Sequence, residues 1–527
     1  MLLQWGQSPG GLIMAASPKW LEKAVFYEIY PQSFFDTNGD GIGDLNGVRK
    51  KLDYIVSMGF NAIWLNPIFE STFFDAGYDV SDYLKVAKRY GGNASLARLI
   101  EACHQRGIRL ILDLVPGHTA INHPWFKQSC KQKKNAYSSR YIWNKDVWNV
   151  DPDFPWIRGF YERNGAVMIN FFSIQPKLNY GFGEVKHPEY EESVEGEGPQ
   201  GTIHAMEDVV RFYLKQGIDG FRVDMAGWLV ARDKDGSATQ RVWKQFFGDI
   251  KAEFPDSAFV SEWASPEKSL PSGFDMDFLL HDMHENSFGL LCRGERPFFQ
   301  KNGDDQTAVK YFQFVLPLMD IAKQQGKYLA MISGNHDTIR LSEWLDETEA
   351  SLSFLFMATM PNVPFFYYGD EIHMAYLKGI PSVEGGYHRT GSRSPMQWDN
   401  AKKNAGFSSS RKTYIRLDPK RKGVSVAEEE KDPNSLLNRL KATLAVKKGH
   451  PALDNDASFR LLDNGKDGLL SYEREKDGEL LRVCINPRGQ KRDIPLQGGE
   501  LVFALGQATT GHSLILGPQS GAIVKIK

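Results

Sequence analysis

The sequence predicts an α/β fold: a closed (β/α)8 barrel, or TIM barrel, with an inserted domain after the third strand and a C-terminal antiparallel β-sandwich. Two features predict it. Short apolar or aromatic runs alternate eight times with stretches of helical period, and the last part of the chain holds short strands without helices between them. Continuous apolar strands that alternate with helices are typical of a parallel sheet, and eight of them suffice to close a barrel.

The predicted strands are rich in Val, Ile, Leu and aromatic residues. They span 25–31, 62–68, 109–116, 220–226, 258–264, 275–280, 328–334 and 363–370. The predicted helices carry apolar residues at helical spacing, and several end at a glycine, which is a common C-terminal cap. These helices span 45–59, 94–107, 204–217, 239–253 and 307–326.

One connection is much longer than the others. It joins the third strand to the fourth and is rich in Asn, Tyr, Trp and Gly, so we expect a small irregular domain over the barrel mouth. The C-terminal segments "GLLSYERE", "ELLRVCIN", "LVFAL" and "GAIVKIK" predict the strands of the sandwich. We therefore expect an N-terminal extension (1–18), a catalytic barrel (19–116 and 201–435), an inserted domain (117–200) and a C-terminal β domain (436–527).

The composition excludes several classes of partner. With 63 basic and 65 acidic residues the net charge is −2, so no overall field attracts nucleic acid or an anionic membrane, and a neutral substrate is favoured. The four cysteines have no paired spacing, which argues against a disulfide frame or a zinc site. The N-terminus is unlike a signal peptide. We expect a cytoplasmic protein that is monomeric or weakly self-associating.

Polar side chains stand at the ends of several predicted strands, where the active sites of such barrels lie. Arg222 and Asp224 are two positions apart on the fourth strand and therefore share a face. The others are Asp113 and His118 after the third strand, Glu262 on the fifth, and Asn335, His336 and Asp337 after the seventh. One such carboxylate is ordinary, but three together with an arginine and two histidines indicate an active site.

These residue types suit the cleavage of a glycosidic bond, which needs two carboxyl groups in different environments. Arg222 would favour the ionised form of Asp224, as a nucleophile requires. Glu262 would give a proton to the leaving oxygen. Asp337 would hold sugar hydroxyls and stabilise positive charge at the anomeric carbon, and the two histidines would be neutral donors to the same sugar.

The chain resembles the α-amylase superfamily, glycoside hydrolase family 13, over nearly its whole length. The matching motifs are "DLVPGH" (113–118), "QPKLN" (175–179), "GFRVDMA" (220–226), "SEW" (261–263), "GNHD" (334–337) and "PFFYYGDEI" (364–372). The resemblance implies that Asp224, Glu262 and Asp337 are nucleophile, general acid/base and transition-state stabiliser, and that configuration is retained.

A narrower resemblance comes from "DTNGDGIGDLNG" (36–47) and "SRSPMQWD" (392–399), which are similar to the oligo-1,6-glucosidase and α-glucosidase branch. It implies cleavage of short gluco-oligosaccharides from the non-reducing end. An endo-acting α-amylase, a transglycosylase or isomerase on the same scaffold, and a non-catalytic sugar-binding relative remain as alternatives. Lys177 stands where the branch has an acidic residue and Met225 follows the nucleophile, so the linkage preference stays open.

The segment "DTNGDGIGD" has the alternating oxygen-bearing residues of a calcium loop, with Gly41 at the sixth position. Gly47 stands at the twelfth position, where an EF-hand has Glu, so an EF-hand is excluded. Resemblance to the family's calcium loop implies a structural Ca²⁺ bound by Asp36, Asn38, Asp40, the carbonyl of Ile42 and Asp44. A plain Asx turn is the alternative.

The resemblance also predicts how the substrate pocket is closed. Asp75 and Tyr78 match an Asp-x-Gly-Tyr pattern of exo-acting relatives, and Arg389 and Arg393 lie four apart as in the same proteins. It implies that Asp75 and Arg393 pair with each other behind the terminal glucose. The alternative is that Arg393 is a surface residue in a long loop. Family members usually have Asn where Gly117 stands, so a second calcium is not expected.

Overall fold

The computed structural model describes residues 16–279, 289–419, 423–496 and 498–526. Most of the predicted N-terminal extension, the last residue of the predicted sixth strand (Leu280) and the C-terminal Lys527 lie outside the described residues.

Eight parallel strands form a closed barrel, each inside one of the predicted runs. They are β1 (Phe26–Ile29), β2 (Ala62–Leu65), β5 (Arg109–Leu114), β9 (Gly220–Val223), β10 (Ala258–Ser261), β11 (Met276–Phe278), β12 (Tyr328–Ile332) and β13 (Val363–Tyr367). Phe26 of β1 is paired on one side with Ala62 and on the other with Phe365, which closes the ring. The predicted fold is confirmed.

Successive side chains of each strand point to opposite faces, so the barrel has an inner and an outer core. Phe221 and Val223 of β9 point outward into the cluster shared with the surrounding helices, whereas Arg222 between them points into the barrel. The lower barrel interior is filled by apolar side chains, and there Phe26 stacks on Phe365 with ring centroids 4.2 Å apart. The polar groups collect at the opposite, C-terminal ends of the strands.

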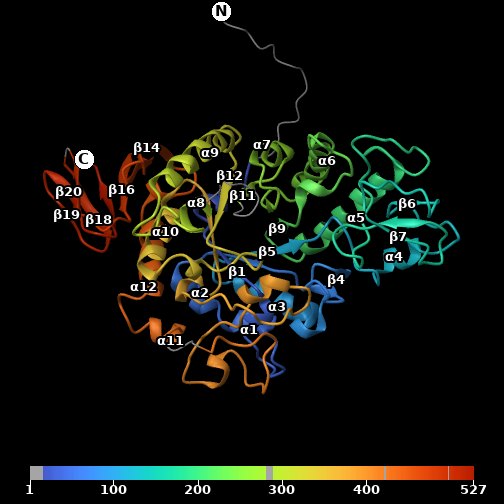
Figure 1. The fold of residues 1–527 in the computed structure, drawn as a ribbon, viewed down its shortest axis with the longest axis horizontal. Coiled ribbons are helices and arrows are strands. Elements are labelled where there is room, and N and C mark those ends of the chain that lie inside the picture. Colours follow the sequence, from blue (N-terminus) through green and yellow to red (C-terminus); the bar gives the residue numbers. More distant parts are fainter. Residues whose placement is uncertain (1–15, 280–288, 420–422, 497, 527) are drawn as a thin grey trace, which may run out of the picture.

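The helices surround the barrel (Figure 1). The longer ones are α3 (Gly92–His104), α5 (Glu197–Leu214), α6 (Ser237–Glu253), α9 (Asp305–Gln324), α10 (Glu347–Thr359) and α12 (Leu436–Gly449). The shorter ones are α7 (Pro266–Ser269), α8 (Gly289–Cys292) and α11 (Val426–Glu429). The helix predicted over 45–59 is divided at Lys51 into α1 (Leu45–Lys50) and α2 (Leu52–Met58). α5 starts before its predicted first residue; its first turns contain Gly and Pro, whose low helix propensity hides this start in the sequence.

Helix α10 was not expected from periodicity. Residues 349–359 are buried on every side, so no polar face marks the helix. The reason is its position between the barrel and the C-terminal sheet, where Leu352 and Leu355 approach Gly521. Its sequence signal is instead the capping box formed by Asp346 and Glu349.

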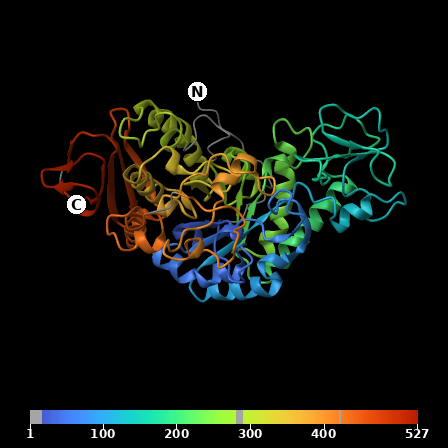
Figure 2. The ribbon, with the colours of Figure 1, turned by 60° about the horizontal axis from the view of Figure 1, so that its bottom comes forward.

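The inserted region holds a small antiparallel sheet of β6 (Trp143–Asn144), β8 (Ala166–Met168) and β7 (Trp156–Arg158), together with α4 (Pro124–Ser129). The preceding hairpin of β3 (Phe69–Ser71) and β4 (Val80–Val86) leads to the third barrel strand. In the turned view the insert and the C-terminal sheets lie at opposite ends of an elongated molecule, with the barrel between them (Figure 2).

The C-terminal region is a β-sandwich. One sheet has the order β14 (Ser458–Asn464), β15 (Leu470–Lys476), β16 (Glu479–Asn486), β21 (Ser520–Lys525), β18 (Glu500–Leu505). The other has the order β17 (Arg492–Pro495), β20 (Ser513–Leu516), β19 (Ala508–Thr510), and side chains of both sheets share one apolar cluster. We propose the same domain division as the sequence does. α12 lies at the start of the proposed C-terminal domain, but it packs against α10 and α2.

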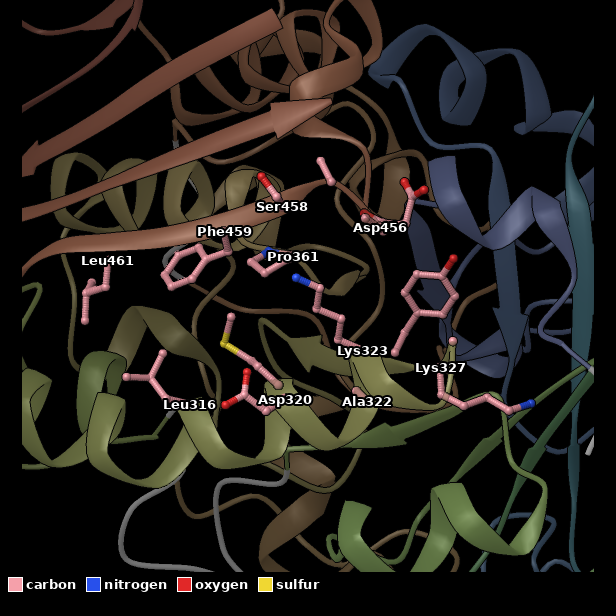
Figure 3. Close-up of a pocket in the computed structure, with 15 residues that line it drawn as sticks. Leu316, Asp320, Ala322, Lys323, Lys327, Pro361, Asp456, Ser458, Phe459 and Leu461 are labelled. Atoms are coloured by element: carbon pink, nitrogen blue, oxygen red, sulfur yellow. The ribbon is translucent and has the colours of Figure 1, made fainter. Parts of the chain in front are cut away.

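A pocket of about 430 Å³ lies between α9, the first residue of β12 and β14 (Figure 3). Tyr328, Phe459 and Leu316 line it together with Lys323 and Asp456. Tyr328 begins β12 at the end of the barrel opposite to the polar strand ends, so this pocket is separate from the predicted active site. Within the described ranges, no helix is both long and apolar enough to cross a bilayer.

Candidate active site

Arg222 is the centre of the polar cluster at the C-terminal ends of the strands. One terminal nitrogen, Nη1, lies 2.6 Å from Asp113 Oδ1 and 3.0 Å from Asp224 Oδ1, while Nη2 lies 2.5 Å from Glu262 Oε1. The guanidinium is 1% exposed. A planar, always charged group can hold three carboxylates at once in fixed directions, because its donors form a rigid fork.

The backbone after β9 places Asp224 beside Glu262. The Asp224 N–H donates to the Leu114 carbonyl of β5 at 2.8 Å, which continues the barrel pairing. Met225 then adopts a left-handed φ of 44°, and its N–H donates to Glu262 Oε2 at 3.0 Å. A left-handed methionine is strained by roughly 1–3 kcal/mol. A Cβ at Gly227 would lie 2.4 Å from the Trp263 indole, so the turn has no room for a side chain there.

Asp337 follows β12 and lies among cations. Its Oδ1 is 2.6 Å from Arg393 Nη2 and 3.1 Å from Arg389 Nη1. Although burial opposes ionisation, His336, Arg393 and Arg389 lower the pKa of Asp337 far below its ordinary value. Its side chain is still 31% exposed, so a ligand can reach this ionised carboxylate.

Arg389, not Arg393, pairs with Asp75. Arg389 Nη2 lies 3.4 Å from Asp75 Oδ1, whose other oxygen accepts from Gln175 Nε2 at 2.8 Å. Arg393 is 1% exposed, and its Nε donates to the His336 carbonyl at 2.8 Å. The predicted Asp75–Arg393 pair is therefore wrong, and so is the alternative of a surface Arg393. Arg389 lies within the 3₁₀ helix η8 (Tyr387–Ser392) and is partly exposed, whereas Arg393 directly follows this helix and is buried against Asp337.

Tyr78 joins the arginine cluster (Arg222 with Asp113, Asp224 and Glu262) to His118 and His336. Its hydroxyl donates to Asp113 Oδ2 at 3.0 Å and lies 2.6 Å from His336 Nε2. His118 Nε2 donates to the Tyr78 carbonyl at 2.9 Å, and its Nδ1 lies 3.0 Å from the Asn170 amide. Burial lowers the pKa of His118 to about 4 and that of His336 below its ordinary value, so both are neutral near pH 7. A sugar would have to displace one of these protein partners.

Burial acts on the carboxyl groups more strongly than the sequence suggested. It raises the pKa of Asp113 to about 6 and raises that of Asp224 well above its ordinary value; Arg222 opposes both shifts. Arg222 does favour the ionised form of Asp224, as expected, but burial outweighs this contact and the pKa of Asp224 rises. Asp113 and Asp224 share one guanidinium and act on each other, so these two carboxyl groups titrate as a pair.

Several buried polar residues of the site were not singled out from the sequence. Glu28 of β1 has its Oε1 2.9 Å from His336 Nδ1, Asn66 Nδ2 lies 2.9 Å from the same nitrogen, and Trp64 Nε1 donates to Asp113 at 3.2 Å. The signal was present for Glu28. An acidic residue inside the apolar run "VFYEIYP" is the same anomaly as Arg222 inside "GFRVDMA".

Lys177 connects the inserted region to the turn that follows Asp224. Its Nζ is buried and donates to the Trp228 carbonyl at 2.9 Å, at the end of the 3₁₀ helix η4 (Ala226–Trp228). Burial lowers the pKa of Lys177 to about 8. The Trp228 indole is 58% exposed. Lys177 thus holds this turn through a backbone carbonyl.

The predicted calcium loop is folded by its own polar side chains. Asp36 accepts hydrogen bonds from three backbone N–H groups of the loop, including that of Gly41 at 2.8 Å. A Cβ at Gly41 would lie 2.1 Å from the Lys412 carbonyl, and its φ of 92° also requires glycine. Asp44 caps the N-terminus of α1. These bonds are the Asx turns named as the alternative to a calcium site.

The Asx turns do not exclude a cation. The predicted ligands offer only oxygen atoms, from Asp36, Asn38, Asp40, Ile42 and Asp44, and this donor set fits a hard cation such as Ca²⁺. Each Asp40 oxygen accepts one hydrogen bond and keeps a further lone pair, whereas each Asp36 oxygen already accepts two, so a bound cation would replace some of the bonds to Asp36. Asp36 and Asp44 are buried, while the Asn38 amide lies 3.0 Å from Asp40 at the loop surface.

A second group of potential metal ligands lies in the insert. Asp151, His187 and Glu191 bring their ligating atoms within 4.8 Å of one another. Arg232 donates to Glu191 Oε2 at 2.9 Å and also contacts Asp151. Because a guanidinium already neutralises both carboxylates, this group is better explained as a buried ion pair than as a metal site.

Comparison with known proteins gives a consistent result. The family described as "Alpha amylase, catalytic domain" matches residues 28–456. The chain is 30% identical to "Alpha-amylase 3" of Dictyoglomus thermophilum, covering 96% of this chain and 94% of that protein. It is 30% identical to an "Alpha-glucosidase" of Apis mellifera, covering 90% and 87%. A mutant of the trehalulose synthase MutB in complex with sucrose superposes with a TM-score of 0.80 at 25% identity, covering 97% and 100%.

Proposed function

The chain belongs to the alpha-amylase family, glycoside hydrolase family 13, and on that premise we propose that it is a retaining α-glucosidase. It would remove glucose from the non-reducing end of short gluco-oligosaccharides. The observation that carries the proposal is the contact of Arg389 with both Asp75 and Asp337. This bridge supports a pocket that is closed behind one terminal sugar unit.

The proposed chemistry proceeds in two steps. Asp224 attacks the anomeric carbon while Glu262 gives a proton to the leaving oxygen, and Asp337 stabilises the positive charge of the transition state. Water then attacks the glucosyl ester and gives a proton back to Glu262. In the structure Glu262 Oε1 forms an ion pair with Arg222, and Oε2 accepts a hydrogen bond from the Met225 N–H. A protonated Glu262 can keep an acceptor bond while its O–H donates to the leaving oxygen.

The test of the proposal is the first product released from maltotriose and maltoheptaose. If the pocket is closed, a polymer cannot pass through it, so glucose should appear first and starch should be a poor substrate. Anion-exchange chromatography of samples taken over time measures this. Early maltose or longer products from maltoheptaose would instead indicate an endo-acting amylase. Sucrose and trehalose belong in the same series, because isomeric disaccharides would indicate an isomerase, as the likeness to trehalulose synthase allows.

Arg389→Ala should open the pocket. We expect kcat/KM for maltotriose to fall by roughly 10–100-fold, mainly through KM, because the residue binds and closes rather than reacts. Maltose should then appear among the first products. Arg393→Ala is the matched comparison. It removes the buried partner of Asp337, so this variant should mainly have a lower kcat, with a smaller change in KM. Identical product patterns for Arg389→Ala and the unchanged enzyme would contradict the assignment.

We propose that the loop at 36–44 binds a structural Ca²⁺. A ligand that binds only the folded state stabilises it by mass action, so a chelator should lower the Tm, and added Ca²⁺ should restore it. Activity at low temperature should persist, since the loop is held against α1 rather than against the proposed catalytic residues. Asp40→Asn should weaken the response to calcium. Loss of activity without loss of stability would contradict a purely structural ion.

A further inference from the structure

Glu28 is a buried carboxyl group in the floor of the proposed active site. It is 0% exposed, and its Oε1 lies 2.9 Å from His336 Nδ1 and 3.4 Å from the His336 backbone nitrogen. Among the described residues, its Oε2 has no hydrogen-bond partner and no lysine or arginine lies within ion-pair distance of it. A carboxylate in this position would carry an uncompensated buried charge.

The bond to His336 is the first of a continuous series. His336 Nε2 lies 2.6 Å from the Tyr78 hydroxyl, this hydroxyl lies 3.0 Å from Asp113 Oδ2, and Asp113 Oδ1 lies 2.6 Å from Arg222. The three protons of this series can be arranged in two ways. In one, the donors run from Glu28 through His336 and Tyr78 to an ionised Asp113. In the other, they run from a protonated Asp113 to an ionised Glu28.

Both arrangements contain the same number of protons, so the position of the negative charge decides between them. On Asp113 the charge is in contact with the Arg222 guanidinium. On Glu28 it would have a neutral imidazole, an amide and the His336 backbone N–H beside it. Burial raises the pKa of both carboxyl groups and Arg222 opposes both shifts, but of the two only Asp113 is in direct contact with the guanidinium. The proton therefore belongs on Glu28.

We propose that Glu28 is a positioning residue: as a neutral donor to His336 Nδ1 it keeps the His336 proton on Nε2. This inference rests on the proposed function. Nε2 is the nitrogen that faces Tyr78 and Asp337, whose Oδ2 lies 3.5 Å away. A proton there can be donated to Asp337 or to a sugar hydroxyl. With the proton on Nδ1, a lone pair would instead face the Asp337 carboxylate.

The direct test is the tautomer of His336. With ¹⁵N-labelled histidine, two-bond proton–nitrogen correlation spectra distinguish the two neutral forms, and His336→Asn assigns the signal among the 12 histidines. We expect Nε2–H in the unchanged protein and in Glu28→Gln, whose amide can still donate to Nδ1. Glu28→Met cannot donate but leaves the Asn66 amide 2.9 Å from Nδ1, so the double variant Glu28→Met/Asn66→Leu should lose this preference. An Nδ1–H tautomer in the unchanged protein would overturn the proposal.

Kinetics give a second readout. Glu28→Gln should keep kcat within about threefold, whereas Glu28→Met should lower kcat by roughly 10–100-fold with little change in KM, as expected for a group that orients a site residue. Tm values compare the stability of the variants. Equal losses in Glu28→Gln and Glu28→Met would contradict a donor role, and if Glu28→Met fails to fold, the spectra of the other two proteins still decide.

The pH profile separates this role from that of an ionised carboxylate. Because a neutral Glu28 does not titrate in the working range, Glu28→Gln should leave the profile of kcat/KM unchanged from about pH 5 to 9. The polar and titratable groups that act on Glu28 are Asn66, Asp113, Arg222, His336 and Tyr367. A shifted profile would overturn the proposal. The spectra need no substrate, so they remain decisive even if the enzyme proves to be an amylase or an isomerase.

Discussion

Replacing Asp224 with Asn should abolish turnover and leave the fold intact. The amide cannot form the glucosyl ester, but it has the shape of the carboxylate and can still accept a hydrogen bond from Arg222, 3.0 Å from the present oxygen. We expect kcat/KM for maltose and for a nitrophenyl α-glucoside to fall by at least roughly 10³-fold. Initial-rate assays on both substrates measure this.

The same substitution should not lower the stability near neutral pH. Burial raises the pKa of Asp224 in the folded protein above its unfolded value. A group of this kind stabilises the fold below its unfolded pKa, and that contribution is lost as the pH rises through the folded pKa. Near pH 7 the folded protein must keep a carboxyl group in a buried site that disfavours its ionised form, and Asn has no charge to bury. The Tm of Asp224→Asn near pH 7 should therefore equal or exceed that of the unchanged protein.

Asp208→Asn is the matched control, because this aspartate is 79% exposed on α5 and remote from the arginine cluster. It should change neither activity nor Tm. Activity of Asp224→Asn within about tenfold of the unchanged enzyme would remove Asp224 from its assigned role. A large fall in Tm would mean that the lost activity reports unfolding rather than chemistry.

The sequence predicts the barrel and its polar centre well for a physical reason. Each barrel strand is buried on both faces, so it appears as an apolar run whatever its neighbours are. A charged residue inside such a run, such as Arg222, must meet opposite charges from adjacent strands. Because parallel strands end at the same edge, the carboxyl groups of Asp113, Asp224 and Glu262 are the groups available to it.

The contacts made by loops could not be predicted in the same way. The spacing of Arg389 and Arg393 is visible, but which of them meets Asp75 depends on the path of η8, which has no periodic signal. The upward pKa shift of Asp224 depends on how deeply the side chain is buried, which no local sequence pattern states. Helix α10 shows the same limit, because a helix buried on all sides has no polar face.

Replacing Glu262 with Gln should have a large effect that depends on the leaving group. An oligosaccharide leaves as an alkoxide that needs a proton, so we expect roughly 10²–10⁴-fold slower turnover of maltose. A nitrophenolate leaves without that help, so the first step with nitrophenyl α-glucoside should remain fast. Glu267→Gln is the matched control, since this glutamate is exposed on α7 outside the cluster.

The second step distinguishes this role from a general loss of the site. Gln cannot take a proton from the attacking water, so the glucosyl ester on Asp224 should accumulate after a burst of nitrophenol. Azide needs no base, and adding it should restore turnover and give glucosyl azide. Two successive inversions require that this product has the α configuration, which proton NMR of the anomeric hydrogen determines. A β product, or equal losses on maltose and the aryl glucoside without rescue, would show that Glu262 is not the acid/base partner of Asp224.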